Sequence, residues 1–415
     1  MNRWIVSRIK FLFGFTLLFL FISQPAHATG IRIPESSLAG LGTADAQVAN
    51  PDDMGALVYN PGGMIFHEGF NVSAGVVLIN PHLSVTPDGG AGQVDSDGSS
   101  IVTIPNLFYS QKLDPDWSIG VNVSSPFGLE TDWPAGTFPA FAGPLAPFEP
   151  SRTKVSMVNI NPTVAHRIHF LNGGLGIGVD FYQVISGVLD TQAVGIHGSG
   201  NGVGWNAGLI SVQGPVSFGV AYRSEVQTNI DGTFNPSQLG SVPSSLSTEI
   251  TFPDMLQVGI RYKVLPTLAV ETDVERTGWH SFDQLTITHS SPGIPSPYVE
   301  NPNWRNSTAY RFGVTYVVIP ALTLRAGYAL DITPQTDSNF SARIPDANRH
   351  SIHSGFSFNG GKWAVEGGYM YVKLVNRNIN NTTPYLGGDP TGTAAFNGNY
   401  ESYGHEFGIT FILRM

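Results

Sequence analysis

The residues that could do chemistry in this chain are few, and their spacing does not form a catalytic site. Serine hydrolysis needs a serine, a histidine and an acid in one constellation. The sequence has 11 histidines but no Gly-x-Ser-x-Gly motif, and residues 195–200 only look similar. His166 and His169, like His350 and His353, are three residues apart, which puts each pair on opposite faces of a strand. Cysteine is absent, which excludes thiol catalysis and zinc fingers. We therefore expect no enzyme activity, no metal and no cofactor.

Residues 126–150 have the composition of a surface that binds hydrophobic molecules. Proline stiffens a backbone, so a proline-rich loop can keep apolar groups exposed without collapsing. Exposed apolar patches usually mark interaction sites. We predict that the aromatic residues of this loop form an exposed apolar interaction surface; the alternative is a loop lid that packs on itself. These aromatic residues are Phe127, Trp133, Phe138, Phe141 and Phe148.

The elements that must position this loop are β-strands. Apolar and polar residues alternate over long segments, which is the period of a strand with one apolar and one polar face. Roughly fourteen such strands fit between Phe70 and Leu413, joined by short turns and long loops in the manner of a barrel. The clearest segments are 117–124, 216–223, 268–275, 310–316, 322–331 and 406–415, the last interrupted only by Ile412.

A transmembrane barrel explains these strands better than a soluble sandwich. The strands are near the roughly 9–11 residues that a tilted membrane strand needs. Their polar faces are rich in glycine, as suits a crowded lumen, and aromatic residues lie at the ends of the apolar faces. Only 13% of residues are charged and the net charge is -10, which argues against a nucleic-acid partner. We predict an all-β fold, a transmembrane antiparallel β-barrel in the bacterial outer membrane.

The N-terminal segments differ from the barrel. Residues 1–28 combine a basic start, an apolar core and the cleavage sequence Ala26-His27-Ala28, which predicts a secretory signal peptide. Residues 29–66 lack strand alternation, and Ser36 is placed to cap a short helix. Because short helices must dock on something, we expect residues 29–66 to plug the lumen as a hatch; a periplasmic linker is the alternative. Residues 67–415 then form the barrel.

Short motifs along the mature chain resemble the FadL family, outer-membrane transporters of long-chain fatty acids and other hydrophobic compounds. The hatch turn Asn60-Pro61-Gly62 departs from the family's more usual Asn-Pro-Ala. The order and spacing of the motifs carry the resemblance: Leu41-Gly42-Thr43-Ala44, Tyr59-Asn60-Pro61-Gly62-Gly63-Met64, Asn161-Pro162-Thr163-Val164-Ala165, Gly204-Trp205-Asn206-Ala207-Gly208, Phe252-Pro253-Asp254-Met255, Ala309-Tyr310-Arg311-Phe312-Gly313 and Ile344-Pro345-Asp346-Ala347-Asn348-Arg349.

The resemblance implies a fourteen-stranded barrel plugged by a hatch, and passive uptake of a fatty acid or similar hydrophobic small molecule. It implies capture in an extracellular groove, for which the aromatic residues of the 126–150 loop are the candidates. It also implies binding in the lumen and lateral release through a gap in the third strand. We expect a monomer, surrounded by outer-membrane lipid and lipopolysaccharide. The alternatives are transport of neutral aromatic or alkane hydrocarbons, a general porin and, remotely, an outer-membrane lipase.

The resemblance also places two sets of site residues. Proline cannot donate to a sheet and glycine weakens pairing, so Ser124, Ser125, Pro126 and Gly128 of the third strand form the candidate wall gap. The alternative is that Pro126 simply ends the strand at the membrane rim.

A fatty carboxylate would need a cation in an apolar pocket. Arg305 is the nearest match to a basic residue of the family. The alternation places Arg223 and Arg311 on the lumen-facing side of their strands. The alternative for these arginines is pairing with lumenal carboxylates such as Glu271 or Glu275. A second basic position of the family is absent within residues 181–189, which leaves room for neutral ligands.

Overall fold

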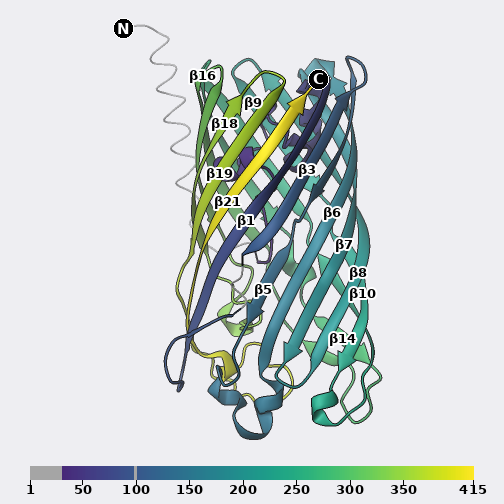
Figure 1. The fold of residues 1–415 in the computed structure, drawn as a ribbon, viewed down its shortest axis with the longest axis vertical. Coiled ribbons are helices and arrows are strands. Elements are labelled where there is room, and N and C mark those ends of the chain that lie inside the picture. Colours follow the sequence, from purple (N-terminus) through teal and green to yellow (C-terminus); the bar gives the residue numbers. More distant parts are fainter. Residues whose placement is uncertain (1–29, 98–100) are drawn as a thin grey trace.

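The wall of the molecule is one antiparallel sheet that closes on itself (Figure 1). The computed structural model describes residues 30–97 and 101–415, so the predicted signal peptide, residues 1–28, lies outside the described residues. Within the described part of the chain, no helix is long and apolar enough to cross a membrane. The predicted fourteen-stranded antiparallel barrel is confirmed.

Several of the barrel strands are split into two pieces. The split strands are β4 with β5, β9 with β10, β11 with β12, β13 with β14, β15 with β16, and β19 with β20, and the short β2 adds to β1. The bounds are β1 (Phe70–Pro87), β2 (Val94–Asp95), β3 (Val102–Lys112), β4 (Trp117–Ser124), β5 (Gly128–Asp132), β6 (Pro150–Ile168), β7 (Gly173–Thr191), β8 (Gly195–Gln213), β9 (Val216–Arg223), β10 (Val226–Asn235), β11 (Ser244–Phe252), β12 (Met255–Leu265), β13 (Leu268–Thr277), β14 (Leu285–His289), β15 (Tyr298–Glu300), β16 (Ser307–Ile319), β17 (Leu322–Asp331), β18 (Arg349–Asn359), β19 (Trp363–Leu374), β20 (Arg377–Ile379) and β21 (Gly398–Arg414).

Helical segments are short and lie in the N-terminal region, the loops and one turn. They are α2 (Leu38–Gly42), α3 (Ala56–Tyr59) and the 3-10 turns η2 (Pro61–Phe66), η3 (Pro139–Phe141), η4 (Gly143–Phe148), η5 (His169–Leu171), η6 (Ser237–Leu239), η7 (Trp279–Ser281), η8 (Asp337–Asn339) and η9 (Ala394–Phe396).

The barrel closes between its first and last strands. β1 pairs with β21 from Asn71–Arg414 to Pro87–Gly398. Closure is required because backbone N–H and C=O groups have no water to bind in lipid.

Side chains alternate across the wall as the sequence predicts. On β21, Phe407 is about half exposed on the outer side, whereas Glu406 and Thr410 are buried in the lumen. Ile412, the apolar exception to the alternation, is also buried, because it belongs to a hydrophobic cluster with Leu57 of the N-terminal segment. The exception therefore marks a contact between the wall and the segment inside it.

Residues 30–66, which we call the hatch, lie inside the barrel (Figure 1). α2 packs against β17, β18, β19 and β21, while η2 packs against β6, β7 and β8. Ser37, rather than the predicted Ser36, caps α2 by accepting a hydrogen bond from the Gly40 amide at 3.0 Å. Helices this short are unstable alone, so contacts with the wall hold them in place.

The two ends of the barrel differ. The C-terminus and the short turns lie at the upper end in Figure 1, and the long loops lie at the lower end. Because outer-membrane barrels have short periplasmic turns and longer extracellular loops, the lower end is the extracellular one. There η3 packs against η4 and η9, so loops far apart in sequence cover the mouth of the barrel together.

Candidate functional site: a lumenal cavity beside a break in the wall

The hatch fits the lumen because the wall facing it is lined with glycine. A Cβ on Gly219 would lie 1.9 Å from the carbonyl oxygen of Val48, and one on Gly327 would lie 2.4 Å from the carbonyl carbon of Thr43. The glycine-rich polar faces seen in the sequence therefore leave room for the hatch backbone. Ten wall glycines would each place a Cβ within 3.0 Å of a backbone or side-chain atom of the hatch, and we call them the glycine belt: Gly120, Gly176, Gly208, Gly219, Gly259, Gly313, Gly327, Gly355, Gly368 and Gly408.

The turn Asn60-Pro61-Gly62 joins the hatch to the wall. The side-chain amide of Asn60 donates through Nδ2 to the carbonyl of Val48 at 2.8 Å and to that of Leu209 in β8 at 3.0 Å. A Cβ on Gly62 would lie 2.4 Å from the carbonyl oxygen of Gly174 in β7. Gly62 therefore lets the hatch backbone lie closer to β7 than a residue with a Cβ would allow.

A row of carboxylates on β13 binds the hatch backbone. Asp273 accepts hydrogen bonds from the amides of Gln47 and Val48 at 2.8 and 3.0 Å. Glu271 accepts one from the amide of Ala49 at 2.8 Å. The acidic face of this strand thus satisfies backbone donors that lie in no helix or strand.

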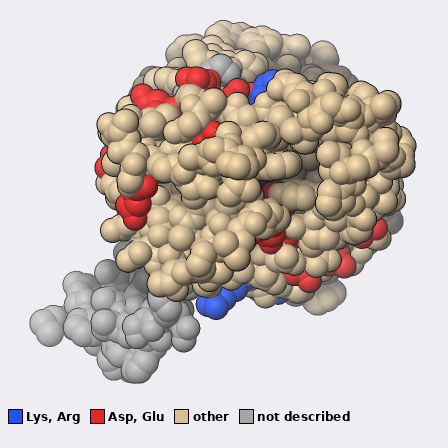
Figure 2. Space-filling view, turned by 90° about the horizontal axis from the view of Figure 1, so that it is seen from below, with Lys and Arg blue, Asp and Glu red and all other residues tan. Residues whose placement is uncertain are grey.

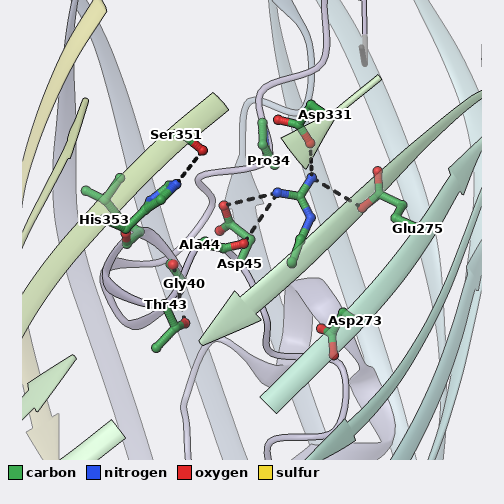
Figure 3. Close-up of polar contacts among 12 residues, drawn as sticks. Pro34, Gly40, Thr43, Ala44, Asp45, Asp273, Glu275, Asp331, Ser351 and His353 are labelled. Carbon is green, nitrogen blue, oxygen red and sulfur yellow. Dashed lines mark hydrogen bonds and ion pairs between the residues drawn. The ribbon is translucent and has the colours of Figure 1, made fainter. Parts of the chain in front are cut away.

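Arg311, one of the predicted ligand cations, is surrounded by acids. Its guanidinium lies 3.2 Å from Asp331, 3.9 Å from Glu275 and 4.0 Å from Asp45. Figure 3 shows the three carboxylates pointing at this one group from the hatch and from two strands. Burial raises the pKa of Asp45, while attraction to Arg311 opposes the shift. Arg311 is thus paired with lumenal carboxylates, which is the alternative that the sequence left open, and through Asp45 it also contacts the hatch.

Neither of the other two predicted cations lines the larger cavity reported next, although Arg223 lines a smaller one of about 40 Å³ with Ser124 and Pro126. Arg223 is ion-paired with Asp180, which is fully buried. Arg305 is exposed, and it is not among the described residues that line the cavity reported next. The prediction of a free cation at Arg223, Arg305 or Arg311 thus finds no support in these contacts.

A cavity of about 490 Å³ lies beside the first residues of the hatch, a volume typical of small-molecule sites. Glu35, Glu130, Asp331 and Glu406 supply carboxylates to it, and Arg32, Lys154 and Arg349 supply cations. Burial and repulsion from Asp45 raise the pKa of the hatch carboxyl Glu35. The apolar lining is Ile33, Ile79, Leu83, Ile104, Phe127, Leu129, Val155, Met157, Met370 and Val372.

The third strand leaves the sheet beside this cavity. β4 ends at Ser124 and β5 begins at Gly128. Between them the carbonyl of Pro126 accepts a hydrogen bond from the Ile33 amide at 2.9 Å, and the Gly128 amide donates to the Ile31 carbonyl at 3.0 Å. The chain therefore pairs with the hatch here instead of with a wall strand.

The break leaves part of the second strand without a neighbour on that side. β3 pairs with β4 only from Leu107–Val123 onward, and no pairing of β3 with β5 exists among the described residues. Ser125, Gly128 and residues 102–104 of β3 all line the cavity. The four predicted gap residues thus lie together at the edge of the cavity or at the strand end next to it.

Residues on the outer side of the wall also line the cavity. On β6, Lys154 and Ser156 lie an even number of residues from Ile160 and so share its face of the strand. Ile160 is 48% exposed on the barrel exterior. Lys154 and Ser156 nevertheless line the cavity. The cavity therefore reaches the outer face of the wall next to the break.

Four of the five aromatic residues predicted to be exposed in the 126–150 loop are buried. Trp133, Phe138 and Phe141 are each 1% exposed and pack with Phe340 and Phe396 of other loops. The Trp133 indole also donates to the Ala342 carbonyl at 2.8 Å. We call this the cap cluster; it corresponds to the self-packed lid that was the alternative.

Phe127 and Phe148 lie elsewhere. Phe127 is fully buried and packs against Phe252 and Trp279. Phe148 is 43% exposed, and among the predicted capture residues it alone offers an open apolar surface within the described part of the chain. Seen from the loop end, the surface is mostly uncharged, with carboxylates toward its margin (Figure 2).

Three charged residues at the break were not predicted from the sequence. Lys154 lies 2.8 Å from Glu130, and Glu130 also binds Arg152, at 2.5 Å. The sequence contained a signal for this site, because Arg152 and Lys154 are cations at positions of β6 where lipid-facing residues are expected. Such a departure from the alternation indicates that the wall there does not face plain lipid.

Comparison with known proteins agrees with this architecture. A family model described as outer membrane protein transport protein (OMPP1/FadL/TodX) matches residues 19–414. The long-chain fatty acid transport protein of Escherichia coli K12 is 24% identical, covering 86% of this chain and 91% of that protein. Outer membrane protein P1 of Haemophilus influenzae is 24% identical, covering 92% of this chain and 93% of that protein.

Solved structures share the fold. A FadL homologue of Pseudomonas aeruginosa superposes with a TM-score of 0.77 at 18% identity, covering 93% of this chain and 100% of that one. The toluene transporter TbuX of Ralstonia pickettii superposes with a TM-score of 0.69 at 14% identity, covering 94% and 99%. With a family model that spans nearly the whole sequence, this barrel is an outer-membrane protein and belongs to the outer membrane protein transport protein (OMPP1/FadL/TodX) family.

Proposed function

We propose that this protein takes up fatty acids or similar hydrophobic molecules passively, and releases them sideways through the break in its third strand. The observation that carries the proposal is the cavity of about 490 Å³, which is lined by apolar side chains and reaches the outer face of the wall beside the break. A ligand held there can pass into the bilayer without returning to water.

The physical reason lies in the solvent that the ligand avoids. Burial of apolar surface is worth about 25 cal/mol per Å², so a dry cavity binds an acyl chain or an aromatic ring. A water-filled channel offers such a molecule no favourable site. The hatch fills the lumen on the periplasmic side of the cavity, and the break at Ser125–Phe127 offers an apolar way out.

The relatives do not share one ligand. They include a long-chain fatty acid transport protein and a toluene transporter. Long-chain fatty acids and neutral aromatic or alkane hydrocarbons are therefore both within the proposal. An uptake screen across these classes, in cells that lack their own transporter of this kind, would distinguish them.

Blocking the break tests the route. A Cβ on Gly128 would lie 2.7 Å from the side chain of Ile33, so Gly128→Trp fills the space between the break and the hatch. We expect uptake of radiolabelled oleate, or of toluene if that probe is the one transported, to fall by about tenfold or more. Ile160→Trp, which adds the same bulk on the exposed outer face of β6, is the matched control. Unchanged uptake by folded Gly128→Trp would contradict lateral release.

Two measurements address the other functions. A general porin would show large, steady single-channel conductance in planar bilayers, and that result would contradict the proposal. We expect only small, irregular conductance from the plugged barrel. An esterase assay on the purified protein addresses the lipase alternative, for which we expect no turnover.

A further inference from the structure

Three ionisable side chains come together where the hatch meets the wall of the cavity. Glu35 of the hatch, Arg349 of β18 and Glu406 of β21 all line the cavity. The Arg349 guanidinium lies within electrostatic range of both Glu35 and Glu406. We call these three residues the anchor group. Since most of the remaining lining is apolar, the anchor group is where the polar end of a ligand would lie.

The other charged groups of the lining already have partners of opposite charge. These pairs are Lys154 with Glu130 at 2.8 Å, Arg32 with Glu275, and Asp331 with Arg311 at 3.2 Å. A ligand anion could bind Lys154 or Arg32 only in competition with a carboxylate that is in place. The anchor group differs from these pairs, because it keeps unused hydrogen-bonding atoms.

Arg349 has a donor that nothing in the described part of the chain uses. Its Nη2 donates to the Gly30 carbonyl and, at 2.9 Å, to Asp346. Its Nε is buried without a hydrogen-bond partner among the described residues. The side chain as a whole is 22% exposed where it lines the cavity. A buried unpartnered donor is costly, and a carboxylate forms the strongest hydrogen bonds with a guanidinium. Arg349 is therefore open to the carboxylate of a ligand.

The two acids of the anchor group do not repel such an anion. Burial and repulsion from Asp45 raise the pKa of Glu35 to about 8, so this carboxyl carries a proton near neutral pH. Glu406 is 5% exposed, faces Glu35, and has one oxygen, Oε2, without a hydrogen-bond partner in the described structure. A carboxyl buried in this way stays neutral, because burying its charge is costly. Protonated carboxyls donate hydrogen bonds, so both acids can serve a ligand carboxylate.

We propose that Arg349, assisted by Glu35 and Glu406, binds the carboxylate of the ligand, and that the cavity therefore favours fatty carboxylates over chains of the same length without an anionic end. This inference rests on the proposed function, because it names the ligand class of the same cavity. The ligand carboxylate accepts hydrogen bonds from Nε of Arg349 and from the two neutral acids. The hydrocarbon chain packs on the apolar lining. The arginine that binds the ligand is thus none of the three predicted from the sequence.

The test compares two probes on the intact protein in lipid nanodiscs, with calorimetric signals corrected by empty nanodiscs. The probes are dodecanoate and 1-dodecanol near neutral pH. Dodecanol is the more hydrophobic probe, so the informative quantity is the change in the ratio of their dissociation constants. We expect Arg349→Gln to weaken dodecanoate by about tenfold to a hundredfold, as for the loss of one charge-assisted hydrogen bond, and to leave dodecanol within about threefold. Arg276→Gln removes an arginine that is paired with Asp254 at 3.0 Å outside the lining, and this matched control should leave the ratio unchanged.

Two further variants keep the test independent of hatch docking, to which Arg349 contributes through Gly30. Arg349→Lys keeps the positive charge beside Asp346 but loses the Nε donor, so dodecanoate should weaken by about threefold or more. Glu35→Gln replaces a neutral carboxyl with an amide that still donates, so dodecanoate should change by less than about threefold.

Four outcomes would contradict these expectations. An unchanged ratio in both Arg349 variants, with dodecanol still bound, would overturn the anchor. Clear tightening of dodecanoate in Glu35→Gln would also overturn it, because Glu35 would then be ionised and repel the ligand. Loss of dodecanoate in Lys154→Gln, with the Arg349 variants unaffected, would move the carboxylate to the rim and leave the uptake proposal standing. If neither probe binds the unmodified protein, the proposed function itself fails.

Discussion

At the scale of single residues, Gly62 shows how closely the hatch and the wall are fitted. A Cβ there meets backbone of β7 rather than a flexible side chain. Gly62→Ala should therefore force a backbone shift and weaken hatch docking by about 1–3 kcal/mol. The readout is protease sensitivity of the hatch under increasing urea. Gly195→Ala, where the nearest atom would lie 3.8 Å from the new Cβ, is the control and should behave like the parent.

Asp53 of the hatch makes a pH-dependent contribution. It is 9% exposed, and burial together with repulsion from Glu366 raises its pKa from 3.8 to about 6. Because the folded state holds this proton more tightly than the unfolded state, hatch docking should weaken as the pH rises from about 4 to about 6, and change no further above that window.

Asp53→Asn should remove this slope and strengthen docking at neutral pH by at most about 3 kcal/mol. The measurement is the urea midpoint of hatch protection at several pH values, taken as variant minus parent. The difference matters because burial lowers the pKa of His67 to about 4, which gives an opposite slope in both proteins. A difference that is constant from about pH 4 to 7 would show that Asp53 titrates normally.

At the scale of elements, the cap cluster predicts a contrast between two phenylalanines. Phe138 is 1% exposed and Phe148 is 43% exposed in the same loop. Phe138→Ala should loosen the loops by about 3–5 kcal/mol and expose them to protease. Phe148→Ala should leave loop stability within about 0.5 kcal/mol but lower uptake at limiting ligand concentration. Equal effects of the two variants on uptake and on proteolysis would show that Phe148 has no separate role in capture.

The sequence predicted the strands well and the loops poorly, for one physical reason. Strand alternation reports whether a side chain faces lipid or lumen, and that depends on local spacing alone. Whether Trp133 is exposed depends on Phe340 and Phe396, which are far away in the sequence. The lumenal arginines could likewise be placed in the lumen by parity, but their partners on other strands and on the hatch could not.

At the scale of the whole molecule, the hatch is the element that separates this barrel from a porin. Deleting residues 30–66 removes the donors that satisfy Glu271 and Asp273 and leaves their carboxylates facing an open lumen. We expect steady, cation-selective conductance in planar bilayers, since the exposed wall is acidic. The full-length protein is the control. Conductance equal to that of the parent would mean that the loops, rather than the hatch, close the lumen.

The glycine belt also bears on how the barrel is assembled. A hairpin that slipped along its neighbour by two residues would return every side chain to its proper face, so alternation alone cannot detect the error. Such a slip would, however, move Gly219 or Gly327 away from the hatch backbone and bring a bulkier residue against it. Only a wall with the correct register can accommodate the hatch, so docking of the hatch depends on the register of the sheet that surrounds it.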